Sequence, residues 1–299
     1  MPARASFLDP LESSNGEHGK LYVVGTPIGN LEDITLRAIR ILKEVNLIAC
    51  EDTRRTQKLL NAYKIQTPTI SYHEHNEMTR APELVIQMEE GSTIALVTDA
   101  GMPVLSDPGF RLVHLAVRHS IPVIPVPGAS AFVAALAASG LPVDKFRFLG
   151  FLPSKKGERR KALELLKDAP KTLVFYEAPH RLLEMLKDTR AILGEREIVI
   201  AREVTKVHEE FVRGTLSAAL EHFKKKPVKG EITVLIGLNA ASDSKSDGPR
   251  TASVMSEIQA VMAANKIDER AALKSVARAR GVSKSEVYRL LQAEKHRDR

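Results

Sequence analysis

The chain has 299 residues, of which 43% are hydrophobic and 27% are charged, and its formal net charge is +7. This length is enough for about two domains with buried cores. A single cysteine, Cys50, excludes a disulfide scaffold, and no apolar run is long enough to span a membrane. We therefore expect a soluble cytoplasmic protein without a metal site.

Residues 1–18 lack the apolar core of a signal peptide, and we expect a disordered tail there. From residue 19 to 126, short apolar runs alternate with amphipathic stretches. The runs that indicate buried strands are LYVVG (21–25), VNLIAC (45–50), STIALVTDAG (92–101) and IPVIPVPG (121–128). Continuous apolar strands separated by helices are typical of a parallel sheet with both faces covered. We predict an N-terminal α/β domain over residues 19–126.

The apolar runs of residues 127–238 lie closer together along the chain. They are TLVFYEAP (172–179), EIVIAREVT (197–205), EEFVRGTL (209–216) and GEITVLIG (230–237). Such close spacing favours partly antiparallel pairing, so we predict a second α/β domain over residues 127–238. Residues 239–251 are rich in Ser, Asp and Ala with almost nothing to bury, which predicts a linker.

Residues 252–299 have the pattern of a helical module. Ser283, with Glu286 three residues later, predicts a capped helix after a break at Gly281. Around that break, the side chains expected to be buried are Ala271, Leu273, Val276, Ala277, Val287, Leu290 and Leu291. Two helices joined by a glycine-containing turn indicate a helix-turn-helix, with Lys284 and Arg289 near its exposed face. A small bundle that only packs on the body or on a second subunit is the alternative.

Basic residues gather in three segments. Residues 251–299 carry ten Lys and Arg against six Asp and Glu, and the other two clusters are SKKGERRK (154–161) and KKKPVKGE (224–231). One such cluster is usually a solvated surface, but three in one chain favour a polyanionic partner.

Four loops that follow the predicted strands of the first domain are rich in small or acidic residues. They are GTPIGN (25–30), CEDTRRT (50–56), TDAGMPVLSDPG (98–109) and VPGASA (126–131). Ligands of parallel sheets bind beyond the carboxyl ends of the strands, so these loops are predicted to form a site for a cationic or hydroxyl-rich ligand. The first loop lacks the Lys and glycine spacing of nucleotide-phosphate motifs. The DPG of residues 107–109 is interpreted as an ordinary turn.

The motifs TPIGNLEDIT, EDTR, TDAGMPVLSDPG, PGASA, GFLP, FYEAPHR, AREVTK and GEITVLI occur in this order along the chain. In order and spacing they resemble the ribosomal RNA small-subunit methyltransferase I branch of the tetrapyrrole methylase superfamily, from about Lys20 through the terminal helical segment. The chain has Thr98 and Met102 where the family often has Ser and Thr, substitutions compatible with the same backbone contacts.

This resemblance implies a fold, a reaction and a partner. The implied fold is of the class III methyltransferase type, with two α/β domains and a cofactor cleft between them. S-adenosylmethionine is the implied methyl donor. The implied acceptor is the 2′-hydroxyl of a cytidine in the decoding region of 16S rRNA, in the small ribosomal subunit. The family is usually a homodimer.

The resemblance also implies site residues. For the cofactor they are Ile28, Asp99, Ala100, Gly101, Val104, Ser130, Ala131, Tyr176 and Glu231. A ribose hydroxyl is a poor nucleophile, so its proton needs an acceptor, and the candidates around it are Glu51, Asp52, Arg54, Glu177 and His180. We prefer Asp52 or Glu177 as the acceptor, with Arg54 and Arg181 holding phosphate. Structural ion pairs between the domains are the alternative for each of them.

Two other functions remain open. A precorrin-type small-molecule methylase would share the cleft but would not need three basic clusters or a terminal helix-turn-helix. A DNA-binding regulator would use the helix-turn-helix but would leave the four loops unexplained. If the protein methylates ribosomal RNA, we expect the terminal module to dock RNA through Lys284 and Arg289.

Overall fold

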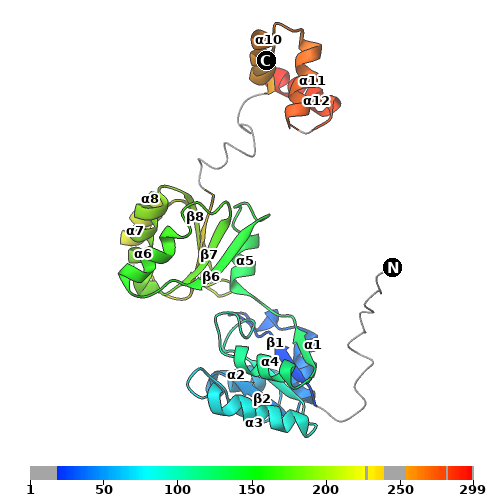
Figure 1. The fold of residues 1–299 in the computed structure, drawn as a ribbon, viewed down its shortest axis with the longest axis vertical. Coiled ribbons are helices and arrows are strands. Elements are labelled where there is room, and N and C mark those ends of the chain that lie inside the picture. Colours follow the sequence, from blue (N-terminus) through cyan, green and yellow to red (C-terminus); the bar gives the residue numbers. More distant parts are fainter. Residues whose placement is uncertain (1–18, 226–227, 239–253, 281, 298–299) are drawn as a thin grey trace, which may run out of the picture. The chain divides into compact units, whose positions relative to one another are not determined.

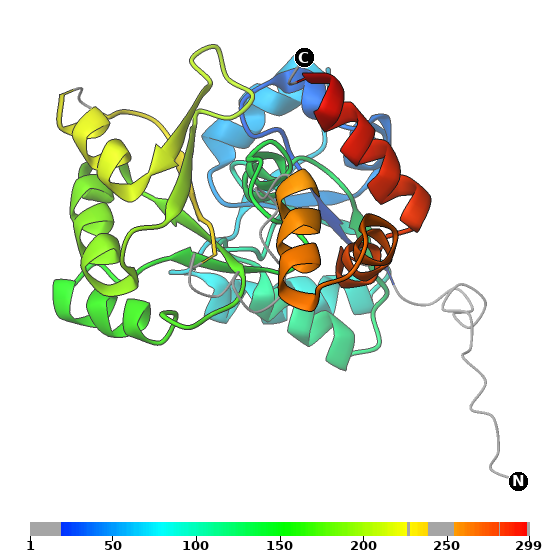
Figure 2. The same ribbon diagram turned by 90° about the horizontal axis from the view of Figure 1, so that it is seen from above.

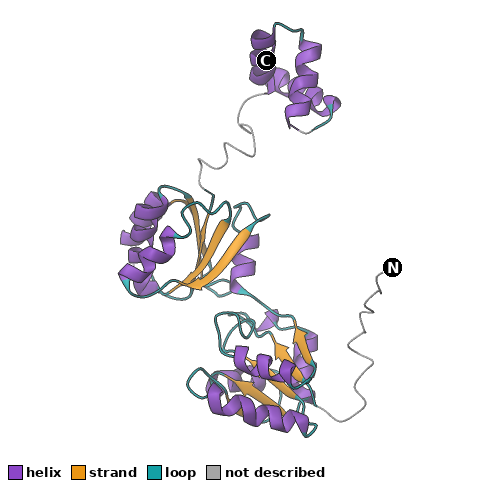
Figure 3. Cartoon of the chain, in the orientation of Figure 1, coloured by secondary structure: helices purple, strands orange, loops and turns teal. Residues whose placement is uncertain are grey.

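The computed structural model of the chain describes residues 19–225, 228–238, 254–280 and 282–297 (Figure 1). The predicted tail, the predicted linker and Gly281 lie outside the described residues. The chain divides into two compact units, Met1–Gly237 and Leu238–Arg299, and each is described by itself. The first unit contains two five-stranded sheets (Figure 3). The domain boundary expected at residue 126 falls between these sheets and stays a prediction.

The first sheet is entirely parallel, as the continuous apolar runs predict. Its strands are β1 (Leu21–Val24), β2 (Leu47–Cys50), β3 (Thr69–Ser71), β4 (Ile94–Val97) and β5 (Val123–Val126), in the order β3-β2-β4-β1-β5. The sequence pattern does not predict β3, because its three residues are only partly buried and form no apolar run.

Helices cover both faces of this sheet. One core joins it to α1 (Leu36–Glu44) and α2 (Thr53–Ala62). The other joins it to α3 (Glu77–Glu89) and α4 (Phe110–Arg118). A short 3-10 helix, η1 (Leu31–Asp33), precedes α1. Because both faces are buried, the strands are apolar along their whole length and do not alternate.

The second sheet is mixed, which confirms the partly antiparallel prediction. Its strands are β6 (Phe146–Phe151), β7 (Thr172–Glu177), β8 (Glu197–Arg202), β9 (Glu210–Thr215) and β10 (Ile232–Ile236), in the order β6-β7-β10-β8-β9. Only β6 and β7 pair in parallel. Strand β6 was not among the predicted strands, because half of its side chains are exposed.

Helices also lie on both faces of the second sheet (Figures 1 and 2). The large core contains side chains of α6 (Lys156–Glu164), α7 (Leu182–Leu193) and α8 (Leu216–Lys225). A smaller core on the other face contains α5 (Ala131–Ala137), which begins directly after the PGASA loop. A 3-10 helix, η2 (Pro179–Arg181), connects β7 to α7.

One predicted basic cluster is partly structural. Arg159, in the segment 154–161, is buried, and its guanidinium lies 2.7 Å from the buried carboxylate of Asp188 on α7. It also donates to the Ser154 carbonyl at 3.1 Å. This ion pair ties α6 to α7, so the charge of Arg159 does not contribute to a polyanion surface.

The second unit is a group of helices with its own core. They are α10 (Val254–Asn265), α11 (Glu269–Arg280) and α12 (Lys284–Arg297). The Glu286 N–H donates to the Ser283 hydroxyl at 3.3 Å, which confirms Ser283 as the cap of α12. The helix-turn-helix geometry stays a prediction. None of the described helices in either unit is both long and apolar enough to cross a membrane.

Two side chains expected in this core are exposed. Ala272 takes the buried place expected for Ala271, and Leu290 is 44% exposed while Val287 and Leu291 are buried. On α12 the buried residues Val287 and Leu291 are thus four positions apart and lie on one face of the helix. Leu290 lies about a quarter-turn to the side of that face. Apolar spacing alone could not decide which edge of each stripe faces the neighbouring helices.

Close backbone contact between two loops holds the first sheet's strand ends together. A Cβ built on Gly25 would lie 2.7 Å from the Cα of Gly128, and one built on Gly128 would lie 2.7 Å from the Cα of Gly25. Real Cβ atoms do not approach this closely. The loops after β1 and β5 therefore need glycine at both positions.

We predict that Gly25→Ala and Gly128→Ala each lower the free energy of unfolding by roughly 1–3 kcal/mol, the usual effect of overpacking. Urea denaturation monitored by circular dichroism would measure this. The matched control is Gly157→Ala in α6, where an added Cβ meets no described atom within 4 Å. Since alanine is the better helix former, this control is expected to stabilise by up to about 1 kcal/mol. Equal effects in all three variants would contradict the contact.

Candidate active site

A cavity of about 410 Å³ lies at the carboxyl ends of the parallel strands, and both sheets contribute to its wall. The four loops predicted from the sequence meet there. The lining residues are Ile28, Glu51, Arg55, Asp99, Ala100, Gly101, Met102, Leu105, Ser106, Asp107, Ser130, Ala131, Phe151, Tyr176, Glu177, Ala178, Pro179, Val204, Gly230, Glu231, Ile232 and Thr233.

The loop after β1 is bonded directly to the loop after β4. The Thr26 N–H donates to the Gly101 carbonyl at 2.9 Å, and the Gly101 N–H donates to the Thr26 carbonyl at 3.1 Å. The Thr26 hydroxyl also donates to the Thr98 carbonyl at 3.1 Å. Gly101 has φ +85°, a left-handed conformation that favours glycine. These bonds set the wall on which Ile28 and Gly101 lie.

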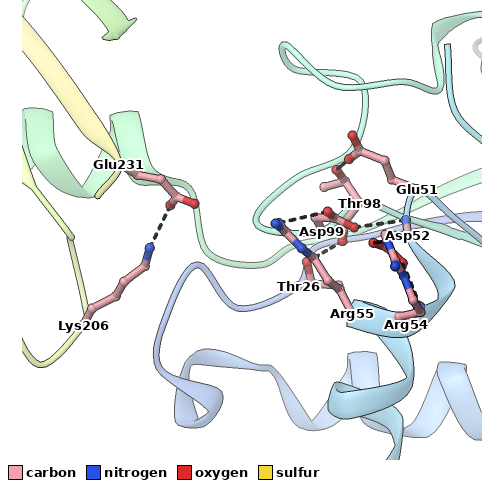
Figure 4. Close-up of polar contacts among 9 residues, drawn as sticks. All are labelled: Thr26, Glu51, Asp52, Arg54, Arg55, Thr98, Asp99, Lys206 and Glu231. Carbon is pink, nitrogen blue, oxygen red and sulfur yellow. Dashed lines mark hydrogen bonds and ion pairs between the residues drawn. The ribbon is translucent and has the colours of Figure 1, made fainter. Parts of the chain in front are cut away.

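Asp99 is held in place by two donors from the loop and helix after β2. Its carboxylate accepts from the backbone N–H of Asp52 at 3.1 Å and lies 3.0 Å from the Arg55 guanidinium (Figure 4). The two loops are therefore joined through a charged hydrogen bond. Asp99 and Arg55 largely neutralise each other on this part of the wall.

Asp52 and Arg54 lie off the cavity wall. Asp52 caps α2 by accepting from the Arg54 N–H at 2.9 Å, and its second oxygen lies 2.9 Å from the Arg54 guanidinium (Figure 4). These hydrogen bonds from Arg54 lower the pKa of Asp52 to about 2. A carboxylate with so low a pKa is a weak base. The catalytic roles expected for this pair stay predictions.

Glu177 lines the cavity at the end of β7 and is buried. Its Oε1 accepts from the Ala178 N–H at 2.8 Å and lies 3.2 Å from Nε of Arg181. Its Oε2 is buried and has no hydrogen-bond partner among the described residues. Burial raises the pKa of Glu177, against the opposing effect of the Ala178 N–H and the Arg181 charge. An unpaired buried acceptor costs about 1–3 kcal/mol. Because the Glu177 side chain has no exposed surface, a donor on a ligand would reach this oxygen only after the side chain turns toward the cavity.

Arg181 and His180 lie beside Glu177 in η2 without lining the cavity. The Arg181 guanidinium donates to the Leu152 carbonyl and pairs with Glu177, which leaves its side chain 21% exposed. Arg181 thus connects Glu177 to the segment directly after β6. Its expected phosphate contact stays a prediction.

Two further carboxylates share the wall near Thr98. The Thr98 hydroxyl donates to Glu51 at 3.0 Å. Burial raises the pKa of Asp107 to about 6. The neighbouring Thr98 hydroxyl opposes this rise, and the charges of Glu51, Asp99 and Glu231 reinforce it. Asp107 was interpreted from the sequence as part of an ordinary turn. Its place in the site depends on the loops that carry Glu51, Asp99 and Glu231, and a local sequence motif does not reveal such contacts.

Glu231 comes from the second sheet, at the start of β10. Its carboxylate lies 3.0 Å from Lys206 (Figure 4). Lys206 also pairs with Glu203 at 2.9 Å. The Glu231 side chain is 67% exposed, unlike that of Glu177. Among the described residues, five carboxylates line the cavity and the only cationic side chain on the wall is Arg55. In a chain of net charge +7, this local excess of acid favours a ligand that carries positive charge.

The residues implied for the cofactor gather on this wall, apart from Val104. The lining includes Ile28, Asp99, Ala100, Gly101, Ser130, Ala131, Tyr176 and Glu231. Val104 packs beneath the loop, with φ 77°, and its N–H donates to the Pro108 carbonyl at 3.3 Å. Sequence reasoning missed Asp107 and Phe151, although both lie in motifs that it singled out. No group of metal-binding side chains is present in the described part of the chain.

The model of the family described as Tetrapyrrole (Corrin/Porphyrin) Methylases matches residues 20–220, about two-thirds of the chain. The chain belongs to the tetrapyrrole methylase family. This confirms the resemblance carried by the motifs, and it makes the chain a methyltransferase. The two sheets, each with helices on both faces, form the fold that the family predicts, and the terminal helices lie outside the matched residues.

Two relatives within the family are named Ribosomal RNA small subunit methyltransferase I. The one from Halalkalibacterium halodurans is 48% identical over 279 residues, which cover 93% of this chain and 96% of the relative. The one from Thermotoga maritima is 53% identical over 218 residues, which cover 73% of this chain and 98% of the relative.

A solved structure of another methyl transferase has the same fold. It is uroporphyrin-III C-methyl transferase from Thermus thermophilus, complexed with S-adenyl homocysteine. This structure is 23% identical, covers 73% of this chain and 97% of its own, and has a TM-score of 0.53.

We predict that Asp107→Asn changes how stability depends on pH. The ionised form of Asp107 is disfavoured in the folded protein, because its pKa rises from the ordinary 3.8 to about 6. Its protonated form therefore contributes stability below about pH 4 that is lost as the pH rises through 6. Asparagine resembles that protonated form. Between pH 4 and 7.5, the free energy of unfolding of the variant relative to wild type should rise by roughly 1–3 kcal/mol.

Urea denaturation across this pH range would measure the difference. Asp52→Asn is the control, because the carboxyl of Asp52 titrates near pH 2. The control curve should keep the wild-type slope between pH 5 and 7. A wild-type slope in Asp107→Asn would show that Asp107 ionises without penalty.

Proposed function

We propose that the protein transfers a methyl group from S-adenosylmethionine to the 2′-hydroxyl of a cytidine in the decoding region of 16S rRNA. The observation that carries this proposal is an acidic cavity of about 410 Å³ walled by loops of small residues. It occurs in a chain whose relatives act, by name, on small-subunit ribosomal RNA. The position of the methylated nucleotide rests on the resemblance in the motifs.

The residues of the cavity fit S-adenosylmethionine, which would supply the electrophilic methyl group. Its volume falls within the range of ordinary small-molecule sites. Gly101 and Ala131 permit close approach, and the side chains of Ile28 and Tyr176 offer apolar surface to an adenine ring. The carboxylates on the wall attract the positive charge of a sulfonium and of an amino group. A Thermus relative complexed with S-adenyl homocysteine adds support from the same fold.

For the acceptor, the contacts favour Glu177 over Asp52. Glu177 lies on the cavity wall with one unpaired oxygen and a raised pKa, whereas Asp52 caps a helix and has a lowered one. When bound, S-adenosylmethionine would supply the methyl group, and the Glu177 carboxylate would accept the proton that the ribose hydroxyl loses as its oxygen is methylated. A carboxylate at this place would both orient the hydroxyl and accept its proton.

We infer that the terminal unit docks RNA and takes no part in the methyl transfer. Lys284 and Arg289 are exposed on α12, on either side of the buried Val287. The Thermotoga relative has about 222 residues, since 218 matched residues make up 98% of it. That is close to the length of residues 19–237. The Thermotoga relative, which has the same name as the Halalkalibacterium one, is therefore long enough only for the unit that contains the cavity. Dimerisation, expected from the resemblance, stays a prediction.

We predict that the purified protein transfers labelled methyl groups from S-adenosylmethionine to isolated 30S subunits, and not to tetrapyrroles or duplex DNA. In Ala131→Leu the larger side chain would project from the wall into the cavity, since Ala131 lines it at the start of α5. Cofactor affinity, measured by calorimetry, should fall at least tenfold, and transfer should fall with it.

Ala137→Leu is the matched control, because Ala137 lies at the other end of α5, exposed and off the cavity wall. This variant should bind the cofactor as the wild type does. Unchanged affinity in Ala131→Leu would contradict the cofactor site. Transfer to a tetrapyrrole in preference to 30S subunits would contradict the acceptor.

We also predict that Glu177→Gln lowers turnover by roughly 100-fold or more, the usual contribution of a general base. Cofactor affinity should change by no more than about twofold, because the loss falls on the transition state. Single-turnover kinetics with 30S subunits would measure the first effect and calorimetry the second. If Asp52→Asn abolishes turnover while Glu177→Gln retains it, the acceptor is Asp52.

A further inference from the structure

Strand β6 contains an irregularity beside the cavity. Phe146 pairs with Thr172 of β7 and Phe148 pairs with Val174, so the two pairs are two residues apart on each strand. The next pair is Phe151 with Tyr176. From one pair to the next, β6 therefore moves three residues along the chain while β7 moves two. Side chains alternate along a regular strand, so without this bulge Phe151 would face away from Phe148.

The bulge brings Phe148 and Phe151 onto the same face as Tyr176. Their ring centroids lie 5.1 Å and 5.7 Å from the Tyr176 ring. Both Phe151 and Tyr176 line the cavity, whereas Phe148 packs behind them against Phe132 at 4.3 Å. The strand irregularity thus re-aims one aromatic ring into the site and supports it with others.

Gly150 maintains this geometry. Its φ is +62°, and a Cβ built on it would lie 2.8 Å from the Ser106 hydroxyl. Ser106 belongs to the loop after β4 and itself lines the cavity. The bulge is therefore fixed by a glycine conformation and by contact with the opposite wall.

Phe151 nevertheless remains 54% exposed. On the opposite wall Leu105 also lines the cavity and is 46% exposed. A large apolar ring that is supported from behind and left open to a cavity is suited to contact with a ligand. Nucleobases present flat faces of this kind, and bases of single-stranded RNA commonly stack on aromatic side chains.

We propose that Phe151 is the platform on which the base of the acceptor nucleotide stacks while its ribose hydroxyl enters the cavity. This inference rests on the proposed function. The cofactor would occupy the inner cavity with its acidic wall, which leaves the exposed aromatic edge for the acceptor. Phosphates would stay outside that wall, where the exposed Lys155 and Lys156 follow β6 in the chain. Phe151 would thus be a positioning residue for the acceptor.

The absence of tryptophan from the sequence makes a direct test possible. Phe151→Trp introduces the only tryptophan, at the proposed platform. With S-adenosylhomocysteine present, a single-stranded RNA oligonucleotide of the decoding-region sequence should quench its fluorescence, because a stacked base quenches indole. The same oligonucleotide with an abasic acceptor position should not quench it.

Phe146→Trp is the matched control, because Phe146 is 44% exposed on the same strand and off the cavity wall. Its fluorescence should not respond to the acceptor base. In kinetics with 30S subunits, Phe151→Ala should raise KM by roughly 10–100-fold, the worth of one stacked base. Phe151→Trp should keep KM within about threefold, and cofactor affinity should be unchanged in both variants.

Wild-type KM in Phe151→Ala would overturn the platform. So would an equal loss of cofactor affinity, which would assign the ring to the adenine of the cofactor. If the wild type methylates no 30S subunits, the proposed function fails, and the fluorescence arm still decides the platform. Quenching by the intact oligonucleotide alone would then support base stacking, and no difference from the abasic one would refute it.

Discussion

The contact between Gly25 and Gly128 is the constraint on which the site depends. With no Cβ at either position, the loops after β1 and β5 touch through their backbones. The next residue, Thr26, is then placed to exchange two backbone hydrogen bonds with Gly101 in the loop after β4. The Asp99 carboxylate extends the connection to the loop after β2. Four loops from distant parts of the sequence thus become one wall, whose shape is set mainly by backbone contacts.

The charge on this wall is opposite to that of the chain. Carboxylates dominate a cavity in a protein of net charge +7, and burial leaves Asp107 and Glu177 with raised pKa values. This separation suits an enzyme with a cationic cofactor and a polyanionic acceptor. An acidic interior attracts a sulfonium and repels phosphate, so only uncharged parts of a nucleotide would enter. In the proposed function, the phosphates would instead be bound by basic residues that are not on the cavity wall.

The loop after β4 contains strained backbone. Val104 and Ser106 have φ values of 77° and 68° there. A β-branched residue such as Val104 adopts the left-handed region at a cost of about 1–2 kcal/mol. Hydrogen bonding of its N–H to Pro108 and packing against Gly109 hold it there. The strained loop carries Leu105, Ser106 and Asp107 to the cavity, which a relaxed turn would direct elsewhere.

The sequence by itself determined the parallel sheet, because burial on both faces requires continuous apolar strands, and the family, because its motifs keep their order. Loops after parallel strands meet at one edge, which predicted that the four loops form a site, and the resemblance in the motifs implied Ile28, Gly101 and Ala131 within it. Only the tertiary structure decided which carboxylate reaches the cavity. Asp52 follows β2 and Glu177 ends β7, but Asp52 caps a helix whereas Glu177 is buried with one oxygen that has no partner among the described residues. The raised pKa of Asp107 depends on burial and on charges from residues distant in sequence. The side of the sheet that Phe151 faces depends on the register between β6 and β7, which is set by packing between elements.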